Sequence, residues 1–165
     1  MEYPQYDETK HLIQLNAKKP CLINNLENDK KMVSHHTALI YTMVLVSAAD
    51  GDMTDAELAV IGDIIRTLPV FADYDTDRLT QTAADCAEML GADDGFETVL
   101  AMIAQALPER LRETAYVLAC DVAAADLAAD QEELRMLEML RNLLKIQRLV
   151  TVAIERAARA RHATA

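Results

Sequence analysis

The stretch that decides the fold is AADGDMTDAEL at residues 48–58, because AADLAADQEEL follows it 76 positions later at residues 124–134. Each stretch comes after an apolar run and opens an amphipathic segment with acidic residues. Apolar residues outside the two stretches also match at the same shift: Val46 with Val122, Ile61 with Leu137, and Ile64 with Leu140. This agreement indicates an internal duplication of a helix–acidic turn–helix unit.

The composition is typical of an all-α protein with one domain. The 165 residues are 52% hydrophobic and include only four Gly and four Pro, which favours helices over strands. A chain of this length buries roughly 70% of its unfolded surface in a single core. We therefore expect about seven helices in one globular domain, with two pseudo-repeated hairpins.

Hydrophobic periodicity and capping residues divide the chain into three parts. Residues 1–33 are polar and irregular and predict an arm with one short helix near residues 7–15. Residues 34–146 hold the helical domain, which opens with a helix over residues 34–49 that is apolar on nearly all sides and should be central. Residues 147–165 predict a basic C-terminal helix and tail. The other helices are expected near residues 54–68, 75–90, 96–107, 109–125, 130–144 and 146–161.

The charge of the chain is negative and uneven. The net charge of −11 divides into 0 over residues 1–49, −16 over residues 50–138 and +5 over residues 139–165. A strongly acidic body repels nucleic-acid phosphates and attracts cations or basic protein surfaces. We expect a protein partner with a basic surface and no nucleic acid. Two other interpretations stay open: the charge serves solubility, or the basic tail folds back on the acidic body.

Neither a membrane span nor a secretion signal is expected. The longest uncharged run, residues 35–49, is shorter than the roughly 20 apolar residues that a transmembrane helix needs. The N-terminal residues lack a basic region followed by an apolar one, so no signal peptide is predicted. Cys21, Cys86 and Cys120 are widely spaced and fit reduced thiols better than a disulfide framework. These features predict a cytoplasmic protein.

The two acidic turns form the candidate metal site. Oxygen ligands suit Ca²⁺, Mg²⁺ or Mn²⁺, and the candidate ligands are Asp50, Asp52, Glu57, Asp126, Asp130 and Glu133. The first turn is not an EF-hand loop, because Asp55 and Ile61 stand where that loop needs Gly and Glu. Helix capping is the competing interpretation, by Thr54 with Glu57 and by Asp130 with Glu133. A shared site requires the two turns to lie side by side.

Asp121 is the one charged residue in the apolar span of residues 114–125, and its counterpart in the first repeat is Leu45. A carboxylate on a central helix must be paired, hydrogen-bonded or exposed, because an unpaired buried charge is costly. We interpret Asp121 either as a structural position or as a partner-binding residue. The sequence has no phosphate loop, nucleophile elbow or supported His-Cys pairing, so no reaction is assigned and a non-enzymatic protein is expected.

The repeated turns resemble those of the TerB family, the tellurite-resistance-associated helical domain. Residues 49–58 follow that family's pattern, and residues 125–134 follow it with Leu127 in place of a glycine. The resemblance spans roughly residues 35–146 and implies an all-helical fold of seven helices. By this resemblance, the candidate site residues are Asp50, Glu57, Asp126 and Glu133.

The same resemblance implies a cytoplasmic role in tellurite or other stress resistance. It also implies association with divalent metal and with other proteins at a membrane-linked complex. Similar domains occur beside J-domain co-chaperones, which favours an adaptor. We therefore expect a non-enzymatic acidic module that acts through protein–protein interaction, with divalent cation binding left open. A dedicated metal-binding protein and a carboxylate-metal hydrolase are the two alternatives.

Overall fold

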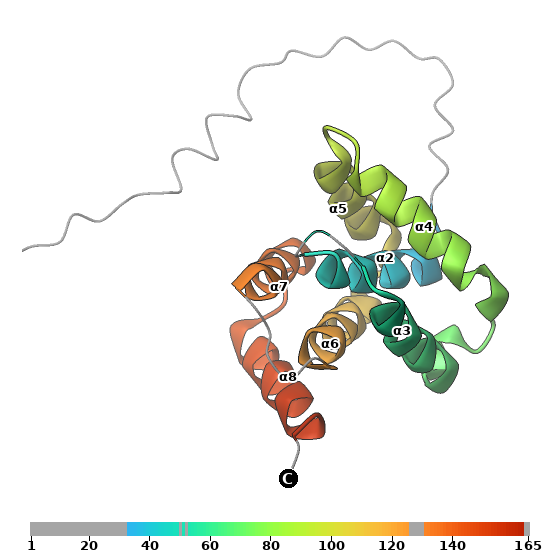
Figure 1. Ribbon diagram of the computed structural model, residues 1–165. Helices are drawn as coiled ribbons and strands as arrows, with labels where there is room; N and C mark the ends of the chain where they lie inside the picture. The colour runs from blue at the N-terminus through green and yellow to red at the C-terminus, as the bar shows by residue number, and fades with distance from the viewer. Residues whose placement is uncertain (1–32, 50, 52, 126–130, 164–165) are drawn as a thin grey trace, which may run out of the picture. The chain divides into compact units, whose positions relative to one another are not determined.

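The computed structural model of the chain describes residues 33–49, 51, 53–125 and 131–163. Those residues form seven α-helices and no strand, which confirms the predicted all-α class (Figure 1). The elements are α2 His35–Ser47, α3 Asp55–Thr67, η1 Pro69–Phe71, η2 Thr76–Arg78, α4 Leu79–Leu90, α5 Gly95–Ala106, α6 Glu109–Ala125, α7 Gln131–Leu144 and α8 Arg148–Arg161, where η marks a short 3₁₀ helix. The short helix predicted near residues 7–15 lies outside the described residues.

The chain divides into residues 1–30 and one compact unit at residues 31–165. Within that unit, α2 occupies the middle and contacts α3, α4, α5, α6 and α7 (Figure 1). Eleven of its 13 residues are buried, as expected for a helix that is apolar on nearly all sides. The three-part division of the chain at residues 33 and 146 stays a prediction.

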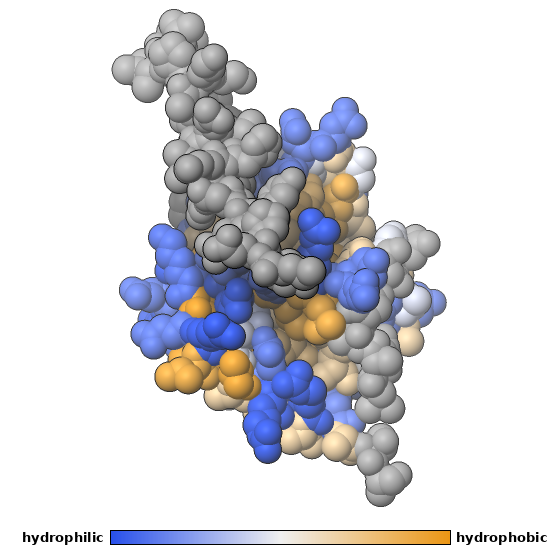
Figure 2. Space-filling view, turned by 90° about the vertical axis from the view of Figure 1, so that its left-hand side faces the viewer, coloured by the Kyte–Doolittle hydropathy of each residue, from blue (hydrophilic) through white to orange (hydrophobic). Residues whose placement is uncertain are grey.

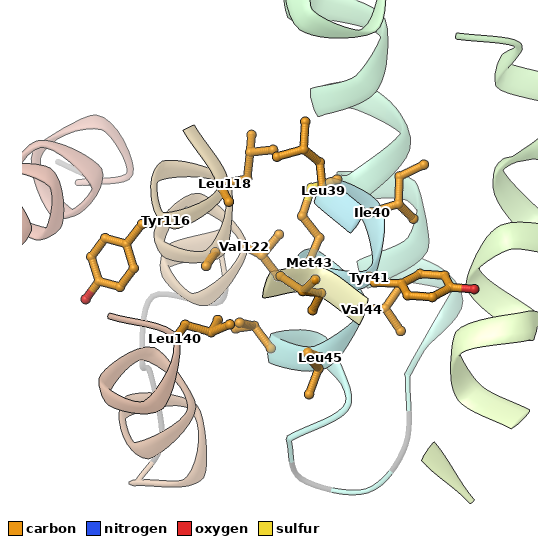
Figure 3. Packing of buried hydrophobic residues seen from close by; sticks show 14 of the residues in the cluster. Leu39, Ile40, Tyr41, Met43, Val44, Leu45, Tyr116, Leu118, Val122 and Leu140 are labelled. Carbon is orange, nitrogen blue, oxygen red and sulfur yellow. The ribbon is translucent and has the colours of Figure 1, made fainter. Parts of the chain in front are cut away.

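The core lies largely between α2 and α6. Leu39 and Met43 of α2 point toward Leu118 and Val122 of α6, whereas Tyr41 points to the opposite side of α2 (Figure 3). Burying one large apolar side chain stabilises the fold by about 1.5–3 kcal/mol, so this paired layer contributes substantially to folding.

The three buried polar residues of α2, which are His36, Thr42 and Ser47, all have hydrogen-bond partners within the protein. The Thr42 hydroxyl donates to the carbonyl of Ala38 at 2.8 Å, and His36 Nε2 donates to the carbonyl of Val70 at 2.9 Å. Ser34 caps the helix by accepting a hydrogen bond from the backbone N–H of Thr37 at 3.1 Å. Because an unsatisfied buried polar group costs about 1–3 kcal/mol, these bonds make the full burial of α2 tolerable.

The two predicted hairpins pack reciprocally. The helix α3 of the first hairpin contacts α6 of the second, and α7 of the second hairpin contacts α2 of the first. Val46 and its repeat partner Val122 are both buried, and so are Ile61 and Leu137. The matching burial of matching positions supports the internal duplication inferred from the sequence.

Two helix starts differ from the sequence-based expectation. The helix predicted from residue 75 begins as the 3₁₀ turn η2, capped by Asp75, before it continues as α4. The last helix begins at Arg148, two residues after the predicted start. Lys145 causes this delay, because its left-handed φ of 56° ends α7 and turns the chain.

The turn at Lys145 predicts a stabilising substitution. The backbone N–H of Ile146 donates to the carbonyl of Arg141 at 3.2 Å, and the backbone N–H of Lys145 donates to the carbonyl of Asn142 at 3.3 Å. This pair of hydrogen bonds is a Schellman C-cap. Glycine adopts this φ without the steric cost borne by lysine. We expect Lys145→Gly to raise the free energy of unfolding by about 0.5–1 kcal/mol in urea denaturation. The control Lys145→Ala should give no gain, and an equal gain in both variants would contradict this explanation.

Candidate functional site

The first acidic turn joins α2 to α3 through Gly51 and Thr54. Gly51 has a φ of 113°, a conformation that other residues rarely adopt. The backbone N–H of Glu57 donates to the Thr54 hydroxyl at 3.3 Å. In return, Glu57 Oε2 accepts from the backbone N–H and from the hydroxyl of Thr54, each at 2.7 Å. The predicted capping box is therefore present.

The second carboxylate oxygen of Glu57 is also engaged. Glu57 Oε1 accepts a hydrogen bond from the hydroxyl of Ser47 at 3.2 Å, and Ser47 is a buried residue in the last turn of α2. Glu57 thus fastens the start of α3 to the end of α2. A cation at Glu57 would compete with these three donors. The metal-ligating role of Glu57 stays a prediction.

The described residues contain only part of the candidate metal site. Glu133 lies half-buried in the first turn of α7. The other four candidate ligands lie outside the described residues: Asp50, Asp52, Asp126 and Asp130. The proximity of the two turns is therefore an untested expectation. Within the part of the chain that the structure describes, no three His, Cys, Asp or Glu side chains are grouped so that they could hold a metal ion.

The end of α2 does lie next to the start of α7. Ala48 and Ala49, just before the first acidic turn, line a cavity of about 410 Å³ together with Glu132 and Arg135 of α7. Glu133 is the ligand predicted from the sequence, whereas the neighbouring Glu132 lines this cavity. The flanks of the two repeats thus share one region of the molecule.

Asp121 forms an ion pair with Arg161 near the end of α8. His162 Nε2 lies 3.9 Å from the same carboxylate oxygen, and the Asp121 side chain is only 15% exposed. The repeat partner Leu45 is fully covered by the core. Asp121 differs from Leu45 because it faces the basic helix α8, which packs against α6. The proposed partner-binding role of Asp121 stays a prediction.

A groove between α6, α7 and α8 was missed by sequence reasoning. Its volume is about 450 Å³, and its lining includes Cys120, Leu134 and Ala158. The hydroxyl of Tyr116 donates to Glu155 Oε1 at 2.8 Å in the same groove. Burial raises the pKa of Cys120 to about 12, so this thiol is protonated and unreactive at neutral pH. Figure 2 faces the side of α7 and α8, where apolar residues lie between hydrophilic ones.

A second surface that was not predicted is the acidic ridge, which we define as the acids of residues 73–94 along η2, α4 and the turn that follows. All seven are exposed: Asp73, Asp75, Asp77, Asp85, Glu88, Asp93 and Asp94. Arg78 is the only lysine or arginine in this range. Asp73 lies 3.3 Å from His36 Nε2, and Asp85 accepts a hydrogen bond from Gln81. The ridge therefore projects largely uncompensated negative charge into solvent.

The fold and these surfaces define an acidic, all-α protein built on two reciprocally packed helical hairpins. The model of the family Tellurite resistance protein TerB matches residues 36–156. Because that match spans well over half of the 165 residues, the chain belongs to the TerB family, as its turn motifs predicted. The match continues beyond residue 146 into α8.

Two further comparisons gave no relatives: no curated protein and no solved structure matches the chain. A search of the described helices for a membrane span found none that is long and apolar enough.

The capping box at the first turn predicts a local loss of stability. Thr54→Ala removes the hydroxyl that accepts from the N–H of Glu57 and donates to its carboxylate. We expect this change to lower the free energy of unfolding by about 1 kcal/mol, measured by urea denaturation. Because the two residues act as one unit, Thr54→Ala and Glu57→Ala together should cost less than the sum of the single changes. Strict additivity would argue against the reciprocal cap.

The Asp121–Arg161 pair predicts a small, shared contribution to stability. Arg161 is 56% exposed, so solvent screens the pair and its loss should cost under about 1 kcal/mol. Asp121→Asn and Arg161→Gln should each speed amide hydrogen exchange at the end of α8, and the double variant should add little. Arg156→Gln, an exposed arginine on the same helix, is the control and should leave that exchange unchanged. Unchanged exchange in both pair variants would refute this anchoring role.

Proposed function

We propose that the chain is a non-enzymatic cytoplasmic module that acts in resistance to tellurite or a related stress. In this proposal it binds a protein partner with a basic surface through the acidic ridge. Membership of the TerB family supports the stress-related role. The exposed, uncompensated charge of the ridge is the observation that carries the partner-binding part.

The ridge has the rigidity that a recognition surface needs. The opposite face of α4 is fixed in the core by Thr82, Ala83 and Cys86, and α4 contacts both α2 and α5. The two acids of α4, Asp85 and Glu88, are therefore held in place while they remain exposed to solvent. Such a surface attracts a basic partner at long range, and the attraction weakens as salt rises.

Divalent cation binding at the acidic turns is the alternative proposal, either beside the partner or as the whole function. A carboxylate-metal hydrolase is a further alternative, supported only by the number of acids in the sequence of the two turns. The family resemblance also supports a setting at a membrane-linked complex or beside a co-chaperone. Each of these alternatives requires a test that distinguishes it from partner binding at the acidic ridge.

The first test reverses charge on the ridge. Asp85→Lys together with Glu88→Lys changes two exposed acids of α4. We expect the pair to weaken partner binding roughly 10- to 100-fold, because like charges then face each other. In the chain's own host, growth of the variant in tellurite should fall to that of a deletion strain. The control Asp63→Lys with Glu109→Lys makes the same charge change at exposed acids elsewhere and should retain growth.

If the ridge variant is folded and still supports normal growth in tellurite, the ridge is not the functional surface. Loss of protection in both variants would mean that net charge, and not the ridge, matters. Thermal unfolding in EDTA, Ca²⁺, Mg²⁺ and Mn²⁺ tests the alternative, because a bound ion raises the melting temperature by mass action. A rise that disappears in Glu57→Gln, whose carboxylate is at the first turn, would favour the metal proposal.

A further inference from the structure

The most exposed large apolar side chain of the described residues lies on α8. Leu149 is 84% exposed, and Val152 one turn further along is 52% exposed. Both lie away from the face of α8 that carries the buried Thr151 and Ala158 against the body. An isolated leucine on a surface needs no explanation, but a pair of apolar side chains beside an apolar groove marks a contact surface.

Such a groove lies directly beside Leu149. It has a volume of about 610 Å³ and runs between α8, α6 and the end of α3. Its lining is apolar apart from two positions, Glu113 and Thr114 of α6; the apolar lining is Leu68, Val117, Leu118, Leu149, Val150, Ala153 and Ile154. The protruding side chain of Leu149 and a groove that could receive such a side chain therefore belong to the same surface.

We propose that two copies of this chain associate through this surface, with Leu149 of each copy inserted in the groove of the other. A protrusion and a recess side by side are self-complementary under a two-fold axis, which is the commonest symmetry of homodimers. The groove, at about 610 Å³, is large enough to receive a leucine side chain. This proposal does not depend on the acidic ridge or on the proposed function.

The charges on the surface favour a second copy over another occupant. Arg148 precedes Leu149 in the chain, and Glu113 lines the groove. Insertion of Leu149 brings Arg148 of one copy near Glu113 of the other, and symmetry makes this contact twice. Figure 1 has α4 and α8 on opposite sides of the molecule, which keeps the two acidic ridges apart.

The test measures mass in solution against concentration. Sedimentation of the full chain from about 1 µM to 200 µM should show a shift from the 18.3 kDa monomer to twice that mass. Leu149→Asp should weaken dimerisation at least roughly tenfold, as expected for a central apolar contact. Leu134→Asp is the matched control, because Leu134 is 52% exposed but lines the groove between α6, α7 and α8. Far-UV circular dichroism should be unchanged in both.

A charge swap makes the test specific for the second copy. Arg148→Glu and Glu113→Arg should each weaken the dimer, and the double variant should regain most of the lost affinity. A wild-type chain that stays monomeric at the highest concentration overturns the proposal. So does a dimer that Leu149→Asp leaves intact, or one that the double variant does not restore, because either result locates the contact elsewhere.

Discussion

The burial of α2 on all sides is the constraint on which the rest of the structure depends. A helix satisfies its own backbone hydrogen bonds, so it can lie in a core where a single strand could not. Its side chains must then be apolar or must find partners, and those of Ser47, Thr42 and His36 do. Helices at the periphery, such as α4, need an apolar face only toward the centre, which leaves the outer face free to carry charge.

That division of faces explains how so acidic a chain keeps a dense core. Apart from Glu57, the acids of α3, α4 and α5 are exposed, whereas the inward positions of the same helices are apolar or small. The positive charge is concentrated near the C-terminus, and α8 holds it against α6 with Arg161 on Asp121. The molecule therefore has an acidic side around α4 and a basic, partly apolar side around α8.

Local signals in the sequence predicted much of the fold. Ser34 and Thr54 cap their helices as expected, because an N-cap depends only on residues within one turn. The start of α8 was predicted two residues too early. A glycine in the sequence would have indicated a left-handed turn after α7, whereas Lys145, which adopts that conformation, does not. The fold class and the family also followed from the repeat.

The site was less predictable than the fold because its contacts are long-range. Asp121 and Arg161 are 40 residues apart, and the hydrogen bond from Tyr116 to Glu155 spans 39. No spacing rule links such positions until the helices are packed. The break in the repeat at Asp121, where Leu45 stands in the first copy, was the one available hint. The capping role of Glu57 was predictable because Thr54 is three residues away.

The reciprocal packing of the hairpins has a consequence for how the chain arose and how it folds. Since α3 also packs on α6 and α7 also packs on α2, either half alone would leave part of its own central helix uncovered. An ancestral single unit would have needed a twin, and gene duplication with fusion would have joined that pair in one polypeptide. The fused chain inherits a kinetic cost, because its core forms only after segments some 70–80 residues apart in sequence have met.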